Sequence, residues 1–198
     1  MSALARLYEE IRACQDCELA KYRTKVVPGE GAEDAEIMFI GEAPGWHEDQ
    51  QGRPFVGPAG QFLDQLLASI ELRREEVYIA NVIKCRPPQN RDPLPVEIES
   101  CRKWLDRQID IIQPKMIVTL GRYSLARYFP NESISKIHGK PRKLGGVIYY
   151  PMYHPAAALH QGSLRRIIEA EVLRIPQILA QGKDLPADMV ESKQLTLF

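Results

Sequence analysis

The length and charge balance of the chain limit the kind of protein it can be. Its 198 residues, 44% of them hydrophobic, suffice for one domain with a buried core. Lys plus Arg and Asp plus Glu both number 26, so a net charge of zero excludes a uniformly basic surface, and any contact with DNA must be local. No apolar run approaches the ~18 residues that cross a membrane, and the first residues lack a signal-peptide pattern. A cytoplasmic protein without a membrane partner is predicted.

Helical and strand patterns alternate along the chain. Apolar residues at helical spacing predict an opening helix over 4–11. Short runs rich in β-branched and aromatic residues predict buried strands at 36–40, 77–83, 115–120 and 147–152. Helical patterns separate or follow these strands at 60–70, 96–112, 122–129 and 164–179. The alternation predicts an α/β fold, a three-layer α/β/α sandwich with a central, mainly parallel four-stranded sheet.

The composition changes near the end of the last predicted helix. From residue 181 the sequence becomes polar, with scattered Pro and Asp, and it ends in QLTLF. Such a composition buries too little apolar surface to fold by itself. We therefore expect one domain over 1–180 and a flexible tail over 181–198.

Unusual residues gather in the loops that follow three of the predicted strands. GEAPGWHED follows the first, Asn81 ends the second with KCRPPQNRDP beyond it, and YHPAAAL follows the fourth. In a parallel sheet the carboxyl ends of the strands lie on one edge, where ligands bind. These segments are predicted to form one site.

Four cysteines form a Cys-x-x-Cys pair and two widely separated single residues, namely Cys14, Cys17, Cys85 and Cys101. In a reducing compartment such a set indicates metal ligands or buried thiols rather than disulfides. The spacing leaves zinc, an iron-sulfur cluster and free thiols all open. A metal centre here would join the N-terminal segment to the Pro-rich loop, which is a structural role.

Individual residues of the expected site each allow two interpretations. Phe55, between Pro54 and Gly57, could stack on a planar ligand or fill the core. His154 could be catalytic or structural. The basic residues Lys140 and Arg142, with Arg165 at the start of the last helix, could contact phosphates or form a solvated face.

Taken together, GEAPGWHEDQQGRPFVGPAGQFLDQLL, the strand ending in Asn81, KCRPPQNR and MYHPAAAL resemble the family 4 uracil-DNA glycosylases over residues 14 to 180. The resemblance implies that the four cysteines hold a [4Fe-4S] cluster. It implies an enzyme that flips uracil out of DNA and hydrolyses its N-glycosidic bond, which starts base excision repair. No lysine is placed as a Schiff-base nucleophile, so a monofunctional enzyme that leaves an abasic site is expected.

The resemblance also implies roles for the residues of the uracil pocket. Phe55 would stack on the uracil ring, and Asn81 would bind its O4/N3 edge and reject cytosine. Glu48 would crowd the C5 position and exclude the methyl group of thymine. His154 would donate a hydrogen bond to uracil O2, where negative charge grows as the bond breaks.

The first motif departs from the best-known members of the superfamily. At the position of Ala43 they have an Asp that orients the water and stabilises the sugar cation. An alanine side chain can do neither. We therefore expect a dissociative path in which Glu42 is the candidate to position water and Asn90 helps. Gly41 and Ala43 would complete the wall of the pocket.

A second departure concerns the residue that fills the space left by the flipped base. Relatives have a bulky apolar residue four positions after the histidine, whereas this chain has Ala158 there. Leu159, the next residue, is therefore the candidate wedge.

The terminal peptide Gln194–Phe198 resembles the motif with which bacterial repair proteins bind the sliding clamp. It would imply a bacterial source. The enzyme is expected to be a monomer in the cytoplasm, at the bacterial nucleoid. Two alternatives remain open: a glycosylase of the same fold for hypoxanthine or xanthine, and a non-enzymatic iron-sulfur DNA-binding module.

Overall fold

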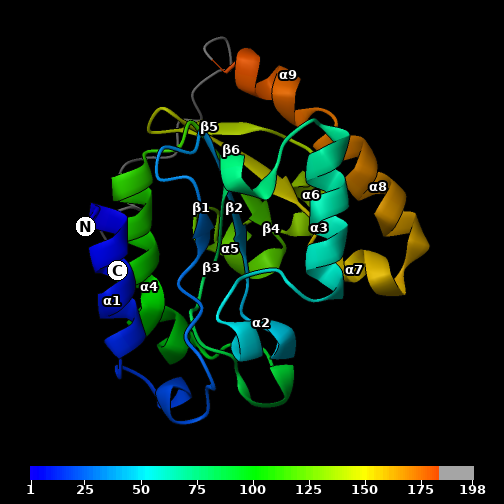
Figure 1. The fold of residues 1–198 in the computed structure, drawn as a ribbon. Coiled ribbons are helices and arrows are strands. Elements are labelled where there is room, and N and C mark those ends of the chain that lie inside the picture. Colours follow the sequence, from blue (N-terminus) through cyan, green and yellow to red (C-terminus); the bar gives the residue numbers. More distant parts are fainter. Residues whose placement is uncertain (183–198) are drawn as a thin grey trace.

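A computed structural model describes residues 1–182 of the chain (Figure 1). Its centre is one six-stranded sheet with the order β1-β3-β2-β4-β6-β5. In chain order the strands are β1 (Glu30–Gly31), β2 (Ile37–Gly41), β3 (Tyr78–Asn81), β4 (Met116–Leu120), β5 (Arg142–Leu144) and β6 (Val147–Met152). The four central strands, β3, β2, β4 and β6, are mutually parallel, and β1 and β5 add antiparallel edges.

The prediction of a mainly parallel α/β sheet is confirmed, but the number of strands was wrong. The four predicted strands form the parallel centre, and the sheet has six strands rather than four. The two additional strands span two and three residues and are only half-buried. Such short edge strands carry no apolar run, so they leave little signal in the sequence.

Helices cover both faces of the sheet (Figure 1). They are α1 (Ala3–Ala13), α2 (Trp46–Gln51), α3 (Pro58–Ser69), α4 (Pro95–Ile112), α5 (Arg122–Ala126), α6 (Ile134–Ile137), α7 (Pro155–His160), α8 (Gly162–Val172) and α9 (Ile175–Ala180). Helices α1 and α4 pack together on one side, and α3, α7 and α8 pack together on the other. No helix within residues 1–182 is long and apolar enough to cross a membrane.

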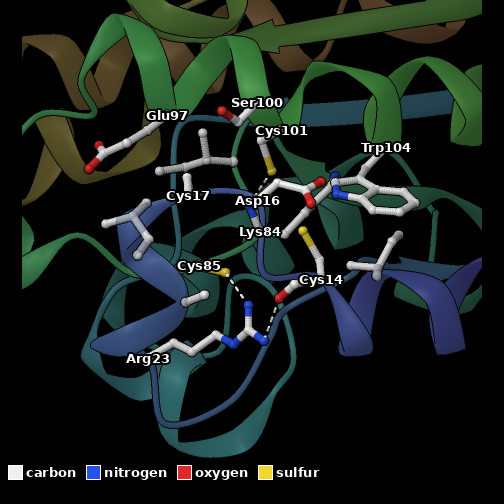
Figure 2. Close-up of a pocket in the computed structure, with 14 residues that line it drawn as sticks. Cys14, Asp16, Cys17, Arg23, Lys84, Cys85, Glu97, Ser100, Cys101 and Trp104 are labelled. Atoms are coloured by element: carbon white, nitrogen blue, oxygen red, sulfur yellow. Dashed lines mark hydrogen bonds between the residues drawn. The ribbon is translucent and has the colours of Figure 1, made fainter.

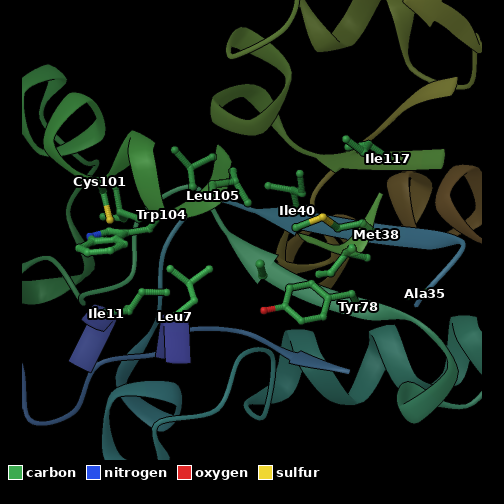
Figure 3. Close-up of a cluster of buried hydrophobic side chains, with 14 of the residues drawn as sticks. Leu7, Ile11, Ala35, Met38, Ile40, Tyr78, Cys101, Trp104, Leu105 and Ile117 are labelled. Carbon is green, nitrogen blue, oxygen red and sulfur yellow. The ribbon is translucent and has the colours of Figure 1, made fainter. Parts of the chain in front are cut away.

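Alternation along the strands divides the core into two parts. In β2, Met38 and Ile40 face a cluster with Leu7 and Leu105 from α1 and α4, which Figure 3 shows. Their neighbours Ile37 and Phe39 belong to a second cluster with the apolar faces of α3, α8 and α9. Because every residue of β2 is buried, the strand reads as continuously hydrophobic in the sequence.

Three helical segments differ from the prediction. Residues 46–51 form α2 where a loop was expected, because Gly45 caps a helix whose third residue, Glu48, accepts the Gly45 N–H. The apolar stretch after His154 is helix α7 rather than a loop, since Pro155 provides a favourable first residue. The last predicted helix is divided into α8 and α9, because Pro176 cannot continue a helix from the preceding turn.

Candidate active site

The carboxyl ends of three parallel strands meet at an open cavity of about 200 Å³. Strand β2 leads into Glu42 and Ala43, β3 ends at Asn81, and β6 is followed two residues later by His154. The predicted pocket residues that line the cavity are Glu42, Ala43, Glu48, Phe55, Asn81, Asn90 and His154.

Phe55 is held in the cavity wall by its backbone. Its φ angle of 51° is in the left-handed region, which a bulky side chain rarely adopts. Oε1 of Glu48 accepts the N–H groups of Val56 and Gly57, both at 2.8 Å. Arg74 donates to the carbonyl oxygen of Phe55 at 3.0 Å. These bonds compensate for the strained conformation and fix the ring.

Asn81 provides a buried amide at the end of β3. Its side chain is almost fully buried, and its Oδ1 has no hydrogen-bond partner within the described part of the chain. A buried acceptor without a partner is rare in a folded protein and indicates a position that a ligand satisfies. Gly41 lies directly beneath it: a Cβ there would overlap Asn81 Oδ1 and come within 2.6 Å of the Phe55 ring.

The His154 ring is oriented by the helix that it precedes. Nδ1 accepts the N–H of Ala156 at 3.1 Å and caps α7, so the ring proton of the neutral form is on Nε2. Burial lowers the pKa of His154 to about 4, which outweighs the opposing effect of the Glu48 charge. The ring stacks on Phe55 with 5.5 Å between centroids and 24° between planes. His154 therefore presents a neutral donor near an aromatic face.

The polar residues on the other side of the cavity are less buried. Burial, and then the charge of Asp92, raise the pKa of Glu42, while Arg122 opposes this effect. Asn90 has a positive φ of 54°, and its Oδ1 accepts Nε–H of Arg86 at 2.7 Å. Glu42 thus stands at the cavity as a carboxyl group with a raised proton affinity.

The sequence analysis missed Arg91, which also lines the cavity. Its guanidinium donates to both oxygens of the buried Glu97 carboxylate, at 2.6 and 2.9 Å. This bidentate bond holds the loop after β3 against the first turn of α4. The only signal in the sequence was its place directly after Asn90.

Glu48 has a role that the sequence analysis did not foresee. Its side chain lines the cavity, but its two oxygens accept N–H groups from Gly45, Val56 and Gly57. The carboxylate therefore joins the start of α2 to the Phe55 loop.

The predicted DNA-contacting residues do not line the cavity. Lys140 donates to the carbonyl oxygen of Lys136, Arg142 pairs with Glu132 at 3.3 Å, and Arg165 pairs with Glu169 on α8. By contrast, Leu159 is 44% exposed on α7, whereas Ala158 is buried. The clamp-like peptide lies outside the described residues.

All four cysteines line a second cavity (Figure 2). Cys14 and Cys17 follow α1, Cys85 follows β3, and Cys101 lies on α4. Arg23 donates to Cys85 Sγ at 3.3 Å, and the N–H of Lys84 donates to Cys101 Sγ at 3.2 Å. Three segments distant in sequence thus bring their thiols to one space.

The space lined by the four cysteines is not a site for a single metal ion in its present arrangement. Within residues 1–182, no group of three or more His, Cys, Asp or Glu side chains has the arrangement of a single-ion site. Burial raises the pKa of the Cys101 thiol to about 12 and also raises that of Cys85. The lining also includes apolar side chains such as Ile11 and Trp104 and the polar residues Asp16, Glu97 and Ser100. The thiols are soft donors, two of them buried and two half-buried, and N–H groups that stabilise sulfur charge reach Cys85 and Cys101.

Comparisons with known proteins place the chain in a family. The family model of the uracil DNA glycosylase superfamily matches residues 28–173. The chain belongs to this superfamily.

Its relatives include several type-4 uracil-DNA glycosylases. That of Sulfurisphaera tokodaii is 48% identical over a match that covers 95% of this chain and 90% of the relative. That of Archaeoglobus fulgidus is 45% identical over 94% of this chain and 97% of the relative. That of Thermotoga maritima is 46% identical over 83% of this chain and 88% of the relative.

Proposed function

We propose that this protein is a monofunctional uracil-DNA glycosylase that flips uracil into the cavity beside Phe55 and hydrolyses its N-glycosidic bond. The observation that carries the proposal is the buried Oδ1 of Asn81, which has no partner among residues 1–182, next to an aromatic ring and a neutral imidazole donor. Membership of the superfamily and the type-4 relatives support the same activity.

The cavity can recognise uracil by stacking and by its edge. The face of Phe55 offers a platform for the planar base. Asn81 Oδ1 can accept the N3–H of uracil while the amide nitrogen donates to O4. Cytosine has an acceptor at N3 and a donor at N4, so both contacts with the same amide orientation would be lost.

His154 can stabilise the leaving base. As the glycosidic bond breaks, the electron pair passes to the uracil ring and charge grows on O2. Because Nδ1 is occupied by the Ala156 N–H, Nε2–H is free to donate to that oxygen. The lowered pKa means that His154 is a neutral hydrogen-bond donor at physiological pH rather than a cation.

Water activation relies on Glu42, because Ala43 has no polar group. Glu42 and Asn90 both line the cavity. Glu42 can orient a water towards the sugar carbon and accept its proton once the bond has lengthened. None of the residues that line the cavity is a lysine. The expected product is therefore an abasic site without strand cleavage.

We infer that the space lined by the four cysteines holds a [4Fe-4S] cluster. In such a cluster each thiolate binds a different iron, and the proposal is supported by the four cysteines lining one cavity. The bound cluster would join the segment after α1 to α4 and the loop after β3. A brown protein with visible absorbance that Cys85→Ser loses would support this cofactor; a colourless protein that binds one zinc would contradict it.

Incubation with matched duplexes tests the activity. Uracil, hypoxanthine and unmodified DNA are each treated with the protein, and abasic sites are then cleaved with alkali. Breaks in uracil DNA alone are expected, and they should fall strongly in Asn81→Ala and His154→Ala. Breaks in hypoxanthine DNA alone would favour the alternative glycosylase, and DNA binding without any base release would favour a non-enzymatic module.

The terminal peptide Gln194–Phe198 is proposed to bind a bacterial sliding clamp. Its Leu and Phe side chains are suitable anchors for a hydrophobic groove. Deletion of 194–198 should abolish clamp binding and leave excision from short duplexes unchanged. A loss of excision on those duplexes would contradict a role restricted to docking.

A further inference from the structure

Trp46 is an exposed aromatic residue beside the cavity that contains Phe55, Asn81 and His154, which is called the base cavity from here on. It is 55% exposed, although large aromatic side chains are usually mostly buried. It is the first residue of α2 and directly follows Pro44 and Gly45, which both line the cavity. None of the roles assigned above uses this ring.

The backbone that carries Trp46 is firmly attached to the cavity wall. Glu48, two residues further along α2, accepts the N–H of Gly45 at 3.1 Å and those of Val56 and Gly57 at 2.8 Å. The ring of His47 stands edge-on to the indole, with 5.0 Å between centroids and 75° between planes. The indole is therefore presented from the same rigid unit that positions Phe55.

A second exposed apolar residue lies on another helix that begins at the cavity. His154 and Ala156 line the cavity, and Leu159, further along α7, is 44% exposed. Helices α2 and α7 thus each carry an exposed apolar side chain. Because the net charge of the chain is zero, affinity for DNA cannot come from a uniform basic field, and stacking on bases can supply part of it.

We propose that Trp46 stacks on the unpaired nucleobase next to the uridine in the same strand. This inference rests on the proposed glycosylase function, since it assumes that the uridine enters the neighbouring cavity. An exposed indole accepts any base, because every base has a π face. The contact requires an unstacked neighbour, so it should favour single-stranded DNA over a fully paired duplex.

Intrinsic fluorescence offers a direct measurement. The chain has two tryptophans, and the other, Trp104, is buried beside the cysteine cavity. The probe is a short single strand with one 2′-fluoro-deoxyuridine, whose glycosidic bond resists hydrolysis. Binding should quench the fluorescence of the wild type and of Trp104→Phe, and should leave that of Trp46→Phe nearly unchanged.

Removing single bases from the probe isolates the contact. Replacing one nucleotide beside the uridine by an abasic spacer should weaken wild-type binding about tenfold. The same spacer should change the binding of Trp46→Ala less than twofold, and Trp46→Tyr should restore most of the difference. Tyr22→Ala is the matched control, because Tyr22 is 63% exposed but does not line the base cavity.

The outcomes separate this inference from the proposed function. If the wild type excises uracil but the spacer weakens Trp46→Ala as much as wild type, Trp46 does not stack and the inference is wrong. If fluorescence is quenched and the spacer effect depends on Trp46 while no uracil is released, the inference on base stacking survives and the glycosylase proposal fails.

Discussion

The Nζ of Lys84 lies 2.8 Å from the carbonyl oxygen of Asn81, and this contact joins the two cavities of the molecule. Nζ also donates to Oε1 of Gln108 at 2.7 Å, while the backbone N–H of Lys84 binds Cys101 Sγ. Lys84 itself is fully buried. One residue therefore touches both the strand end that carries Asn81 and the cysteine that lies on α4.

Lys84→Met should destabilise the protein, because it leaves the Asn81 carbonyl and the Gln108 amide oxygen without their donor. Each buried group left without a partner costs about 1–3 kcal/mol of unfolding free energy. Chemical denaturation measures the loss. Lys115→Met is the control, since Lys115 is exposed and pairs with Glu36 at the surface. Equal stability of Lys84→Met and wild type would show that these bonds contribute nothing.

Phe55→Leu should lower kcat/KM on uracil DNA by about 10- to 100-fold, because leucine keeps apolar bulk but offers no π face for stacking. Phe62→Leu is the matched control: Phe62 is equally buried in the same core but does not line the cavity. Single-turnover kinetics on both variants measure the difference. A Phe55→Leu enzyme no slower than Phe62→Leu would rule out stacking.

The pKa of His154 predicts a specific dependence of stability on pH. The folded protein takes up this proton at about pH 4, whereas an unfolded histidine takes it up near pH 6.5. Between these values the unfolded state binds more protons, so the stabilising contribution is complete above pH 6.5 and is lost as pH falls towards 4.

Unfolding free energies measured from about pH 7 to 4 should therefore fall more steeply for wild type than for His154→Gln. His160→Gln, at an exposed histidine of α7, should keep the wild-type slope. Excision by the wild type should show no inflection near pH 6.5, since His154 is neutral on both sides of it. Such an inflection, absent in His154→Gln, would mean that the imidazolium forms.

Gly41→Ala should reduce both stability and excision. The added methyl group would displace the Phe55 ring and the Asn81 amide, and overpacking of this kind costs about 1–3 kcal/mol. Gly162→Ala is the control, because a Cβ there meets no atom within 4 Å and the residue begins α8. Normal excision by Gly41→Ala would refute the close packing of Asn81 and Phe55.

The parallel core could be predicted because its strands are buried on both faces and separated by amphipathic helices. β1 and β5 could not, since their pairing depends on neighbours and not on periodicity. Helix α2 is short and polar, so only Gly45 and Glu48 indicated its start.

The same distinction applies to the site. Asn81 and His154 could be placed because they follow strands whose ends must meet at one edge. The hydrogen bonds from the loop after Phe55 to the Glu48 carboxylate could not be predicted, because they depend on how residues 52–57 fold back towards α2. The pair Arg91–Glu97 was hidden in the same way, since only the folded loop aligns the guanidinium with the carboxylate.

Helix α7 has His154 at its cap and Leu159 within its last turn. The Ala156 N–H holds the imidazole at the start of this six-residue helix, so a movement of the helix carries both His154 and the exposed leucine. If Leu159 enters the space that a flipped base leaves, its seating in the DNA also sets the height of His154 above the base. A DNA duplex that resists opening would then hold the imidazole away from uracil O2. Cleavage of the glycosidic bond would wait until the uridine is fully flipped out.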